Sequence, residues 1–114
     1  MGTTTISLYR MGNSSGPKMD AVRIKLPDPD IDCFTDTSGT VWVKAGTGCV
    51  SSWETPKTGL RGKSWRIPAG TPYSDRLRVW TDEPGHWLWE PVQDMRLAEF
   101  LDDLAEINKF AQIA

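Results

Sequence analysis

The side chains best suited to chemistry in this chain are one arginine and two adjacent serines. Arg10 ends an alternating segment at residues 4–10, and Ser51 and Ser52 lie in a second short segment at residues 50–53. An arginine at the end of a strand can form paired hydrogen bonds with a carboxylate or a phosphate. A hydroxyl group on a neighbouring strand can order that arginine or contact a sugar.

Aromatic side chains complete this set. Flat rings that could stack against a ligand ring occur in or beside the same segments and near residue 88: Tyr9, Trp53, Trp87 and Trp89. Arginine, serine and aromatic residues on adjacent strands are what a nucleotide-binding cleft needs. The same residues also suit an exposed arginine ion pair, a serine turn and a core filled by large rings. The pattern alone leaves both interpretations open.

Other chemistries find less support in the sequence. The aspartates within residues 28–32 have the spacing of a calcium loop, but Cys33 and Gly39 stand where that loop requires glycine and glutamate. His86 is the only histidine, and no serine has the Gly-x-Ser-x-Gly surroundings of a hydrolase nucleophile. One histidine and two separated cysteines make no zinc site, so no metal is expected.

These residues need strands to position them, and alternation of apolar and polar residues predicts about six short ones. The stretch from residue 67 to residue 91 indicates turn, strand, turn and strand, with the strands at 76–81 and 86–90. Residues 20–26 fit either a strand or a short helix. Further strands are predicted at residues 4–10, 40–44 and 50–53, and from residue 65.

One helix is predicted at the C-terminus. Apolar residues recur with a period near 3.6 between Met95 and Ile113, and Asp94 is suited to cap the first turn. Strands followed by one packing helix indicate an α+β fold, a twisted antiparallel sheet covered by a long C-terminal helix. The length of 114 residues favours a single domain over residues 1–114.

Composition limits the classes of partner. A net charge of −2 gives no electrostatic reason to expect a nucleic-acid or membrane partner. The N-terminal residues lack the basic start and apolar core of a signal peptide, so export would use a route without a cleaved signal. Cys33 and Cys49 could form one disulfide but make no disulfide framework.

Short motifs spread over nearly the whole chain resemble one known family. They are Leu8-Tyr9-Arg10, Pro29-Asp30-Ile31, Gly48 to Glu54, Ile67-Pro68, Gly70-Thr71, Leu77, Val79, Asp82, His86-Trp87 and Pro91. In these motifs the chain resembles the Tse-two-like type VI secretion exported toxins, whose fold is ADP-ribosyltransferase-like. The resemblance implies a compact domain around a split, twisted antiparallel sheet.

The resemblance also assigns roles. Arg10 matches the strand-end arginine that contacts the phosphate or ribose of NAD, and Ser51 matches the second residue of a Thr-Ser pair. Val50 occupies the threonine position, where Ser52 could supply the missing hydroxyl. His86 matches a histidine of the late strand. With Tyr9 and Trp53, the residues Arg10, Ser52 and His86 form the expected NAD-binding set.

A transferase of this type also needs a glutamate near the ribose, to hold the 2′-hydroxyl and to stabilise the oxocarbenium-like transition state. Glu90 is the first choice, and Glu83 and Glu54 are the alternatives. The expected catalytic set is therefore Arg10, Ser51 and Glu90.

The functional expectation is a bacterial toxin that acts in the cytoplasm, as a type VI secretion effector or half of a toxin–antitoxin pair. It would transfer ADP-ribose from NAD or hydrolyse NAD, and an antitoxin or immunity protein would neutralise it. The alternative is a non-catalytic interaction domain of a phage or secretion system. Such a domain would present Trp42, Trp53 and Trp80 to its partner.

Overall fold

The largest layer of the protein is an antiparallel sheet of six strands in the order β11-β6-β2-β5-β9-β8. The computed structural model describes residues 1–25, 27–56 and 62–114. The strands of this sheet are β2 (Leu8–Gly12), β5 (Val50–Trp53), β6 (Lys63–Ile67), β8 (Leu77–Glu83), β9 (His86–Pro91) and β11 (Gln112–Ile113). Together with the helix described below, this layer confirms the predicted α+β class.

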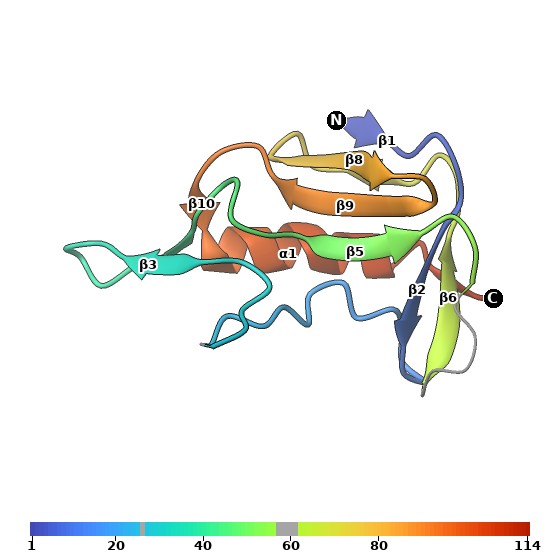
Figure 1. Ribbon diagram of the computed structural model, residues 1–114, viewed down its shortest axis with the longest axis horizontal. Coiled ribbons are helices and arrows are strands. Elements are labelled where there is room, and N and C mark those ends of the chain that lie inside the picture. Colours follow the sequence, from blue (N-terminus) through green and yellow to red (C-terminus); the bar gives the residue numbers. More distant parts are fainter. Residues whose placement is uncertain (26, 57–61) are drawn as a thin grey trace.

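Two smaller sheets flank the main one. One pairs β1 (Gly2–Thr3) with β7 (Pro72–Tyr73), and the other has the order β10-β4-β3. The latter consists of β10 (Met95–Arg96), β4 (Val41–Val43) and β3 (Cys33–Thr35). The β3–β4 hairpin projects from the end of the molecule that lies opposite β2 and β6 (Figure 1). With these short strands, the described residues hold more strands than the six that alternation predicts.

The β8–β9 hairpin confirms the strand, turn and strand predicted between residues 76 and 90. It is longer than predicted, because β8 continues to Glu83 and the turn is confined to Pro84 and Gly85. Gly85 has a φ of 82°, a left-handed conformation that glycine adopts without strain. A bulge between Thr81 and Glu83 shifts the register of the two strands by one residue.

The helix α1 (Leu97–Asn108) is shorter than the predicted helix at both ends. Residues 95–96 form β10 and residues 112–113 form β11, so both flanks pair with strands and are extended. Asp94 does not cap the helix, because Arg96 is the N-cap residue and the Asp94 carboxylate accepts a hydrogen bond from Ala45 N at 2.8 Å. No helix among the described residues is both long and apolar enough to cross a membrane.

Two further predictions need correction. The strand predicted at residues 4–10 is β2, which begins at Leu8 rather than residue 4, because Thr4 bonds to the turn at residues 68–71 instead of a strand. Residues 20–25 form neither a strand nor a helix, and residue 26 lies outside the described residues.

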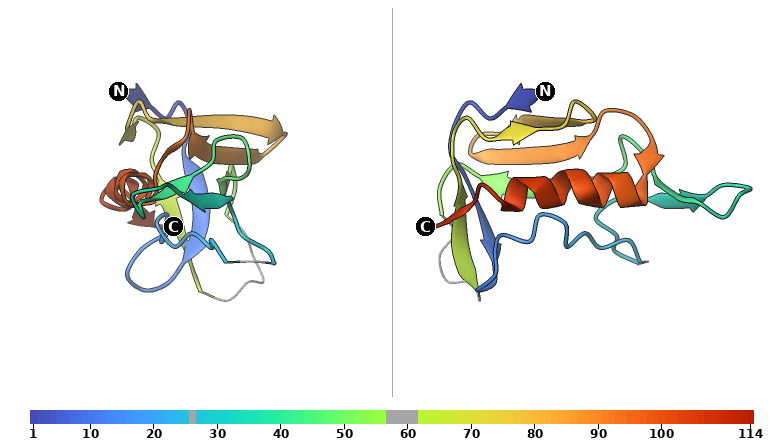
Figure 2. Two further views of the ribbon diagram at one scale, coloured as in Figure 1. Left: turned by 90° about the vertical axis from the view of Figure 1, so that its left-hand side faces the viewer. Right: turned by 180° about the vertical axis from the view of Figure 1, so that it is seen from behind.

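The core lies between one face of the main sheet and α1. Phe100, Leu104 and Ile107 of the helix are fully buried against apolar residues of the sheet such as Val50 and Trp89. Seen from behind, α1 lies across the layer formed by β5 and β9 (Figure 2). Because side chains alternate along a strand, the neighbours of these residues point to the opposite, outer face of the sheet.

The main sheet is split between β2 and β5. These strands pair at a single position, Tyr9 with Trp53, whereas β2 pairs with β6 at five positions. Beyond that position β2 and β6 run away from β5, at a steep angle to β5 and β9 (Figure 1). The split confirms the fold implied by the resemblance. Apart from the pairing at Trp53, no strand among the described residues pairs with this edge of β5.

Candidate functional site

The outer face of the sheet carries most of the residues expected from sequence, arranged in rows across the strands. Tyr9 on β2, Trp53 on β5 and His86 on β9 are successive register partners, so they form one row. The next row contains Ser51, opposite Leu88. Glu90 follows two residues after Leu88, so it points to the same face and is a diagonal neighbour of Ser51, with backbones roughly 7–8 Å apart.

Arg10 lies in the split itself. Its Nη1 donates a hydrogen bond to Ser51 O at 2.8 Å, and its Nε donates to Pro17 O at 3.2 Å. At this position β2 has diverged from β5, and the register of the two strands gives Ser51 no partner on β2. The arginine side chain supplies the missing donor. A guanidinium has more N–H donors than these two contacts use, which leaves donors for an anion.

A hollow of about 280 Å³ runs along the free edge of β5. It is lined by Arg10, Ala21, Arg23, Asp30, Cys49, Val50 and Ser51. The loop side of the hollow is fixed by Arg23, whose Nη2 contacts the Asp30 carboxylate at 2.9 Å. Asp30 also accepts a backbone hydrogen bond from Cys49 N at 3.1 Å, which ties this loop to β5.

Two arginines and one carboxylate line the hollow. Burial lowers the pKa of Arg10 from its ordinary value, and the negative charge of Asp30 acts in the opposite direction. Arg23 is exposed, and its hydrogen bonds to Asp30 raise its pKa. Arginine side chains remain protonated in proteins, so both guanidinium groups can bind an anionic ligand such as a phosphate.

Burial also raises the pKa of the Cys49 thiol, and the nearby charges of Glu90, Asp82 and Asp30 raise it further. A hydrogen bond with the Ser51 side chain acts in the opposite direction. The strand register agrees with this, because Val50 pairs with Trp89, so that Cys49 and Glu90 are the next residues along β5 and β9. Cys33 and Cys49 are both free thiols, so the disulfide considered from sequence is not formed.

Glu90 is buried, with 8% of its surface exposed, and it is paired with Arg78. Both Nε and Nη2 of Arg78 contact the same carboxylate oxygen, Oε1. The guanidinium of Arg78 also lies over the ring of Trp80, 4.9 Å from its centroid. The resemblance points to Glu90, but no motif points to its partner Arg78.

The pairing of Arg78 with Glu90 depends on the bulge in the β8–β9 hairpin, which local sequence patterns do not locate. Near the turn Glu83 faces His86, and continuing that register would place Val79 opposite Glu90. The one-residue shift between Thr81 and Glu83 instead places Arg78 opposite Glu90. A shift of one residue moves every side chain of a strand to the other face, and simple alternation does not locate the shift.

Ser52 lies in the core rather than in the hollow. It is completely buried, its Oγ accepts a hydrogen bond from Trp89 Nε1 at 3.0 Å and donates to Trp87 O at 3.3 Å. Its position one residue after Ser51 turns it to the opposite face of the sheet. The hydroxyl of Ser52 is therefore bonded to two tryptophan residues of β9 and does not line the hollow.

His86 is oriented by two neighbours. Its Nδ1 lies 3.0 Å from Asp82 Oδ1, and its ring stacks on Trp53 with centroids 5.5 Å apart. The other glutamates considered from sequence lie on the periphery. Glu54 accepts a hydrogen bond from Trp87 Nε1 at 2.8 Å, and Glu83 is exposed at the end of β8.

The tryptophans named for the alternative function do not share one surface. Trp42 lies on the projecting hairpin, where it stacks on Phe34 with ring centroids 6.3 Å apart and donates from Nε1 to Asp36. Trp53 and Trp80 lie on the outer face of the main sheet. An interface that used all three would have to span two sheets.

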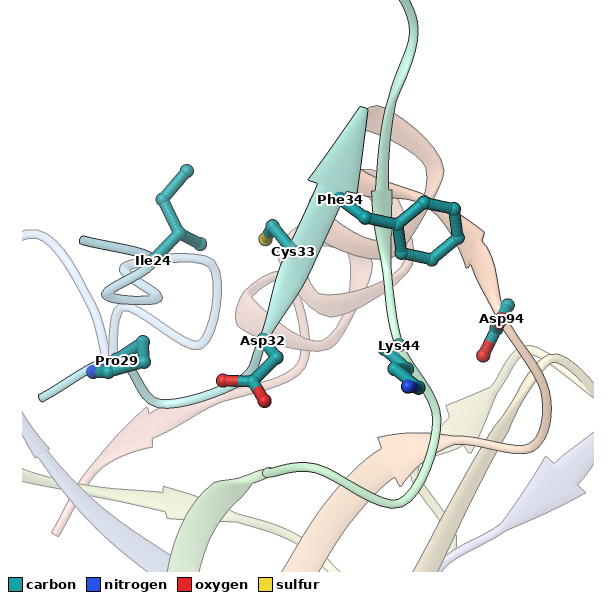
Figure 3. A pocket seen from close by; sticks show the side chains of 7 residues that line it. All are labelled: Ile24, Pro29, Asp32, Cys33, Phe34, Lys44 and Asp94. Carbon is teal, nitrogen blue, oxygen red and sulfur yellow. The ribbon is translucent and has the colours of Figure 1, made fainter. Parts of the chain in front are cut away.

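A larger hollow of about 670 Å³ opens at the root of the projecting hairpin. It is lined by Ile24, Pro29, Asp32, Cys33, Phe34, Lys44 and Asp94, with Ile24 and Pro29 on one side of β3 and Lys44 and Asp94 on the other (Figure 3). None of the residues expected to carry chemistry lines it. The smaller hollow beside Arg10 is therefore the better candidate site.

Taken together, a split antiparallel sheet, a strand-end arginine in the split and a serine beside it define an α+β domain of the ADP-ribosyltransferase-like class. The family model of the Tse2 ADP-ribosyltransferase toxin matches residues 7–112. Since this match covers most of the chain, the protein belongs to the Tse2 ADP-ribosyltransferase toxin family, as its motifs indicate. A search of curated proteins finds no match.

Proposed function

We propose that this toxin acts on NAD, either by transferring ADP-ribose to an acceptor or by hydrolysing NAD. The observation that carries the proposal is the position of Arg10, whose guanidinium lines the hollow and holds the backbone of Ser51. A pyrophosphate is an anion of the kind that this hollow favours. The family to which the chain belongs supports the same substrate.

In the proposed reaction, the bond between nicotinamide and ribose C1′ breaks, and its electron pair leaves with the neutral nicotinamide. The ribose becomes a cation at C1′, and an acceptor or water attacks that carbon and loses a proton. Arg10 orients the phosphates, Ser51 positions the ribose, and Glu90 stabilises the developing positive charge. Tyr9 and His86 flank the end of the site where a ring would stack.

Two of the residues expected at the site take a smaller part in this proposal. The Ser52 hydroxyl is already bonded within the core, so the proposal assigns it to folding rather than to NAD binding. One face of Trp53 is covered by His86, so Trp53 supports the histidine in this proposal.

The test is growth arrest when the chain is expressed in bacteria, with nicotinamide release from NAD measured on the purified protein. We expect the wild type to arrest growth and to release nicotinamide. Ser51→Ala and Glu90→Gln should lower that release by about 100-fold or more, the usual cost of losing a group that stabilises a transition state. Arg66→Ala, an exposed arginine on β6, is the matched control and should remain active. A wild type that is harmless, or that arrests growth without consuming NAD, would refute the proposal.

We further propose that the toxin acts in the cytoplasm and that an antitoxin or immunity protein neutralises it. The support is membership of a toxin family, since a producing cell must survive its own toxin. Co-expression with the product of the adjacent gene should restore growth and give a complex that co-purifies with the toxin. Growth arrest that the adjacent gene does not relieve would remove it as the partner.

A further inference from the structure

We infer that Arg78 is a positioning residue for the proposed reaction. It fixes the carboxylate of Glu90 by binding one carboxylate oxygen, and it leaves the other oxygen for the substrate. This inference rests on the proposed function. It concerns a residue that neither the motifs nor the family match assigns a role.

The contact between the two residues has a specific form. Both Nε and Nη2 of Arg78 contact Oε1 of Glu90, so the pair does not use Oε2. A carboxylate held in this way cannot rotate without losing both contacts. The orientation of Oε2 is therefore set by Arg78 from the neighbouring strand.

Arg78 is itself held in place. Its guanidinium lies over the ring of Trp80, 4.9 Å from the centroid, and Trp80 follows two residues later on the same face of β8. The register pairs Arg78 with Glu90 and Trp80 with Leu88. A rigid strand pair, rather than a loop, therefore sets the geometry of the carboxylate.

The burial of the two partners argues against a purely stabilising role. The Glu90 side chain is 10% exposed and the Arg78 side chain is 56% exposed, so the pair lies at the rim of the sheet face. Ion pairs with a largely exposed partner contribute little to folding stability. The carboxylate of Glu90 is nevertheless buried and is held in place by a charged partner, Arg78.

The position of Glu90 relative to the hollow connects the pair with the candidate site. Glu90 does not line the hollow itself, but it is a diagonal neighbour of Ser51 across β5 and β9, and Ser51 lines the hollow together with Arg10. Arg78 lies on the far side of Glu90 from this hollow, because β8 is the strand beyond β9. Arg78 can therefore influence a ligand in the hollow through Glu90 without contacting it.

The experiment is a double-mutant cycle on the purified protein, with NAD as substrate and nicotinamide release as the readout. We expect Arg78→Gln to lower kcat by about 10- to 100-fold, the scale of effects from a misplaced catalytic group, and to change KM by less than about threefold. In the Glu90→Gln background the same change should have no further effect, because its target is absent. Arg78→Lys should recover part of kcat, because a single ammonium group can reach Oε1.

The matched control is Arg76→Gln on the same hairpin. Arg76 pairs with Asp103 and Glu99 of α1, on the other face of the sheet. The Arg76–Asp103 and Arg78–Glu90 pairs are buried to a similar extent, so both variants should change the melting temperature by a similar, small amount. Arg76→Gln should leave kcat unchanged, and Arg78→Gln should lower it.

The outcomes separate the inference from the proposed function. An Arg78→Gln effect that is equal in the wild-type and Glu90→Gln backgrounds, or that appears in KM alone, overturns the positioning role while NAD chemistry stands. A fully active Glu90→Gln variant also overturns it, by showing that another carboxylate acts. A wild type that releases no nicotinamide overturns both.

Discussion

Nη1 of Arg10 donates a 2.8 Å hydrogen bond to the carbonyl oxygen of Ser51, where β2 has already diverged from β5. A side chain here satisfies a carbonyl that a neighbouring strand would satisfy in a continuous sheet. Backbone groups that lie away from water are nearly always paired in folded proteins. The same arginine therefore both completes the edge of β5 and lines the hollow beside it.

The first prediction concerns the structural half of this role. Arg10→Leu removes the donor for two carbonyl oxygens, Ser51 O and Pro17 O, and we expect it to lower the free energy of unfolding by about 1–3 kcal/mol. Urea denaturation would measure this loss. Arg66→Leu is the control, because Arg66 is exposed and its side chain bonds to Gln112 of the edge strand β11, and its effect should stay within about 0.5 kcal/mol. Equal stability of the Arg10 variant and the wild type would contradict the prediction.

The second prediction separates the two adjacent serines. Ser52→Ala leaves the buried Trp89 Nε1 without its acceptor, so we expect it to lower the free energy of unfolding by about 1–3 kcal/mol. Nicotinamide release per folded molecule should remain. Ser51→Ala should do the reverse, with little change in stability and a large loss of activity. The comparison needs a denaturation curve and a rate for each variant, and the prediction is wrong if both serines behave alike.

A third prediction concerns the close approach of two backbones at the edge of the hollow. A Cβ at Gly48 would lie 1.7 Å from Asp30 O, so Gly48→Ala must push the loop away from β5. We expect a loss of about 1–3 kcal/mol in stability together with a loss of NAD turnover. Gly46→Ala is the control. Its Cβ would meet nothing within 4 Å, although its φ of +80° makes an alanine cost about 1–2 kcal/mol. Turnover that survives Gly48→Ala would mean that the loop does not shape the site.

The fourth prediction follows from the two thiols. Burial raises the pKa of both Cys33 and Cys49 in the folded protein, so the unfolded chain loses these protons first as pH rises. The free energy of unfolding should therefore fall as pH rises above about 8.5, the ordinary cysteine value. Replacing both cysteines by alanine should make that fall shallower. The measurement is urea denaturation of the wild type and of the double variant, below and above that pH. If the free energy of unfolding falls equally with pH in both proteins, the thiols contribute nothing and the prediction is wrong.

Local patterns predict the elements that are long or strongly patterned. The bounds of β5 agree with the predicted segment 50–53, and the β8–β9 hairpin agrees with the alternation on either side of its turn. The helix is present but shorter than its apolar period suggests. Pairing of residues 95–96 with β4 and of residues 112–113 with β6 overrides helical propensity at both ends.

Features that depend on distant partners could not be predicted in this way. The β3 strand has only three residues, so alternation is too short to detect, and its strand state comes from pairing with β4. The alternating residues 20–25 have no strand partner, and they are held instead by contacts such as the Arg23–Asp30 pair. Near the site, sequence selects Arg10, Ser51 and Glu90, but the contacts that orient them depend on a split and a bulge.

The single register position that joins β2 to β5 has a mechanical consequence. A sheet distributes load over every rung of its ladders, and here one rung, Tyr9 with Trp53, connects the half containing β2, β6 and β11 to the half containing β5, β9 and β8. Pulling the halves apart would break few backbone hydrogen bonds. Under a stretching force, the sheet should therefore separate first between β2 and β5. The hydrogen bond from the Arg10 side chain to Ser51 O adds one further link between β2 and β5 at this boundary.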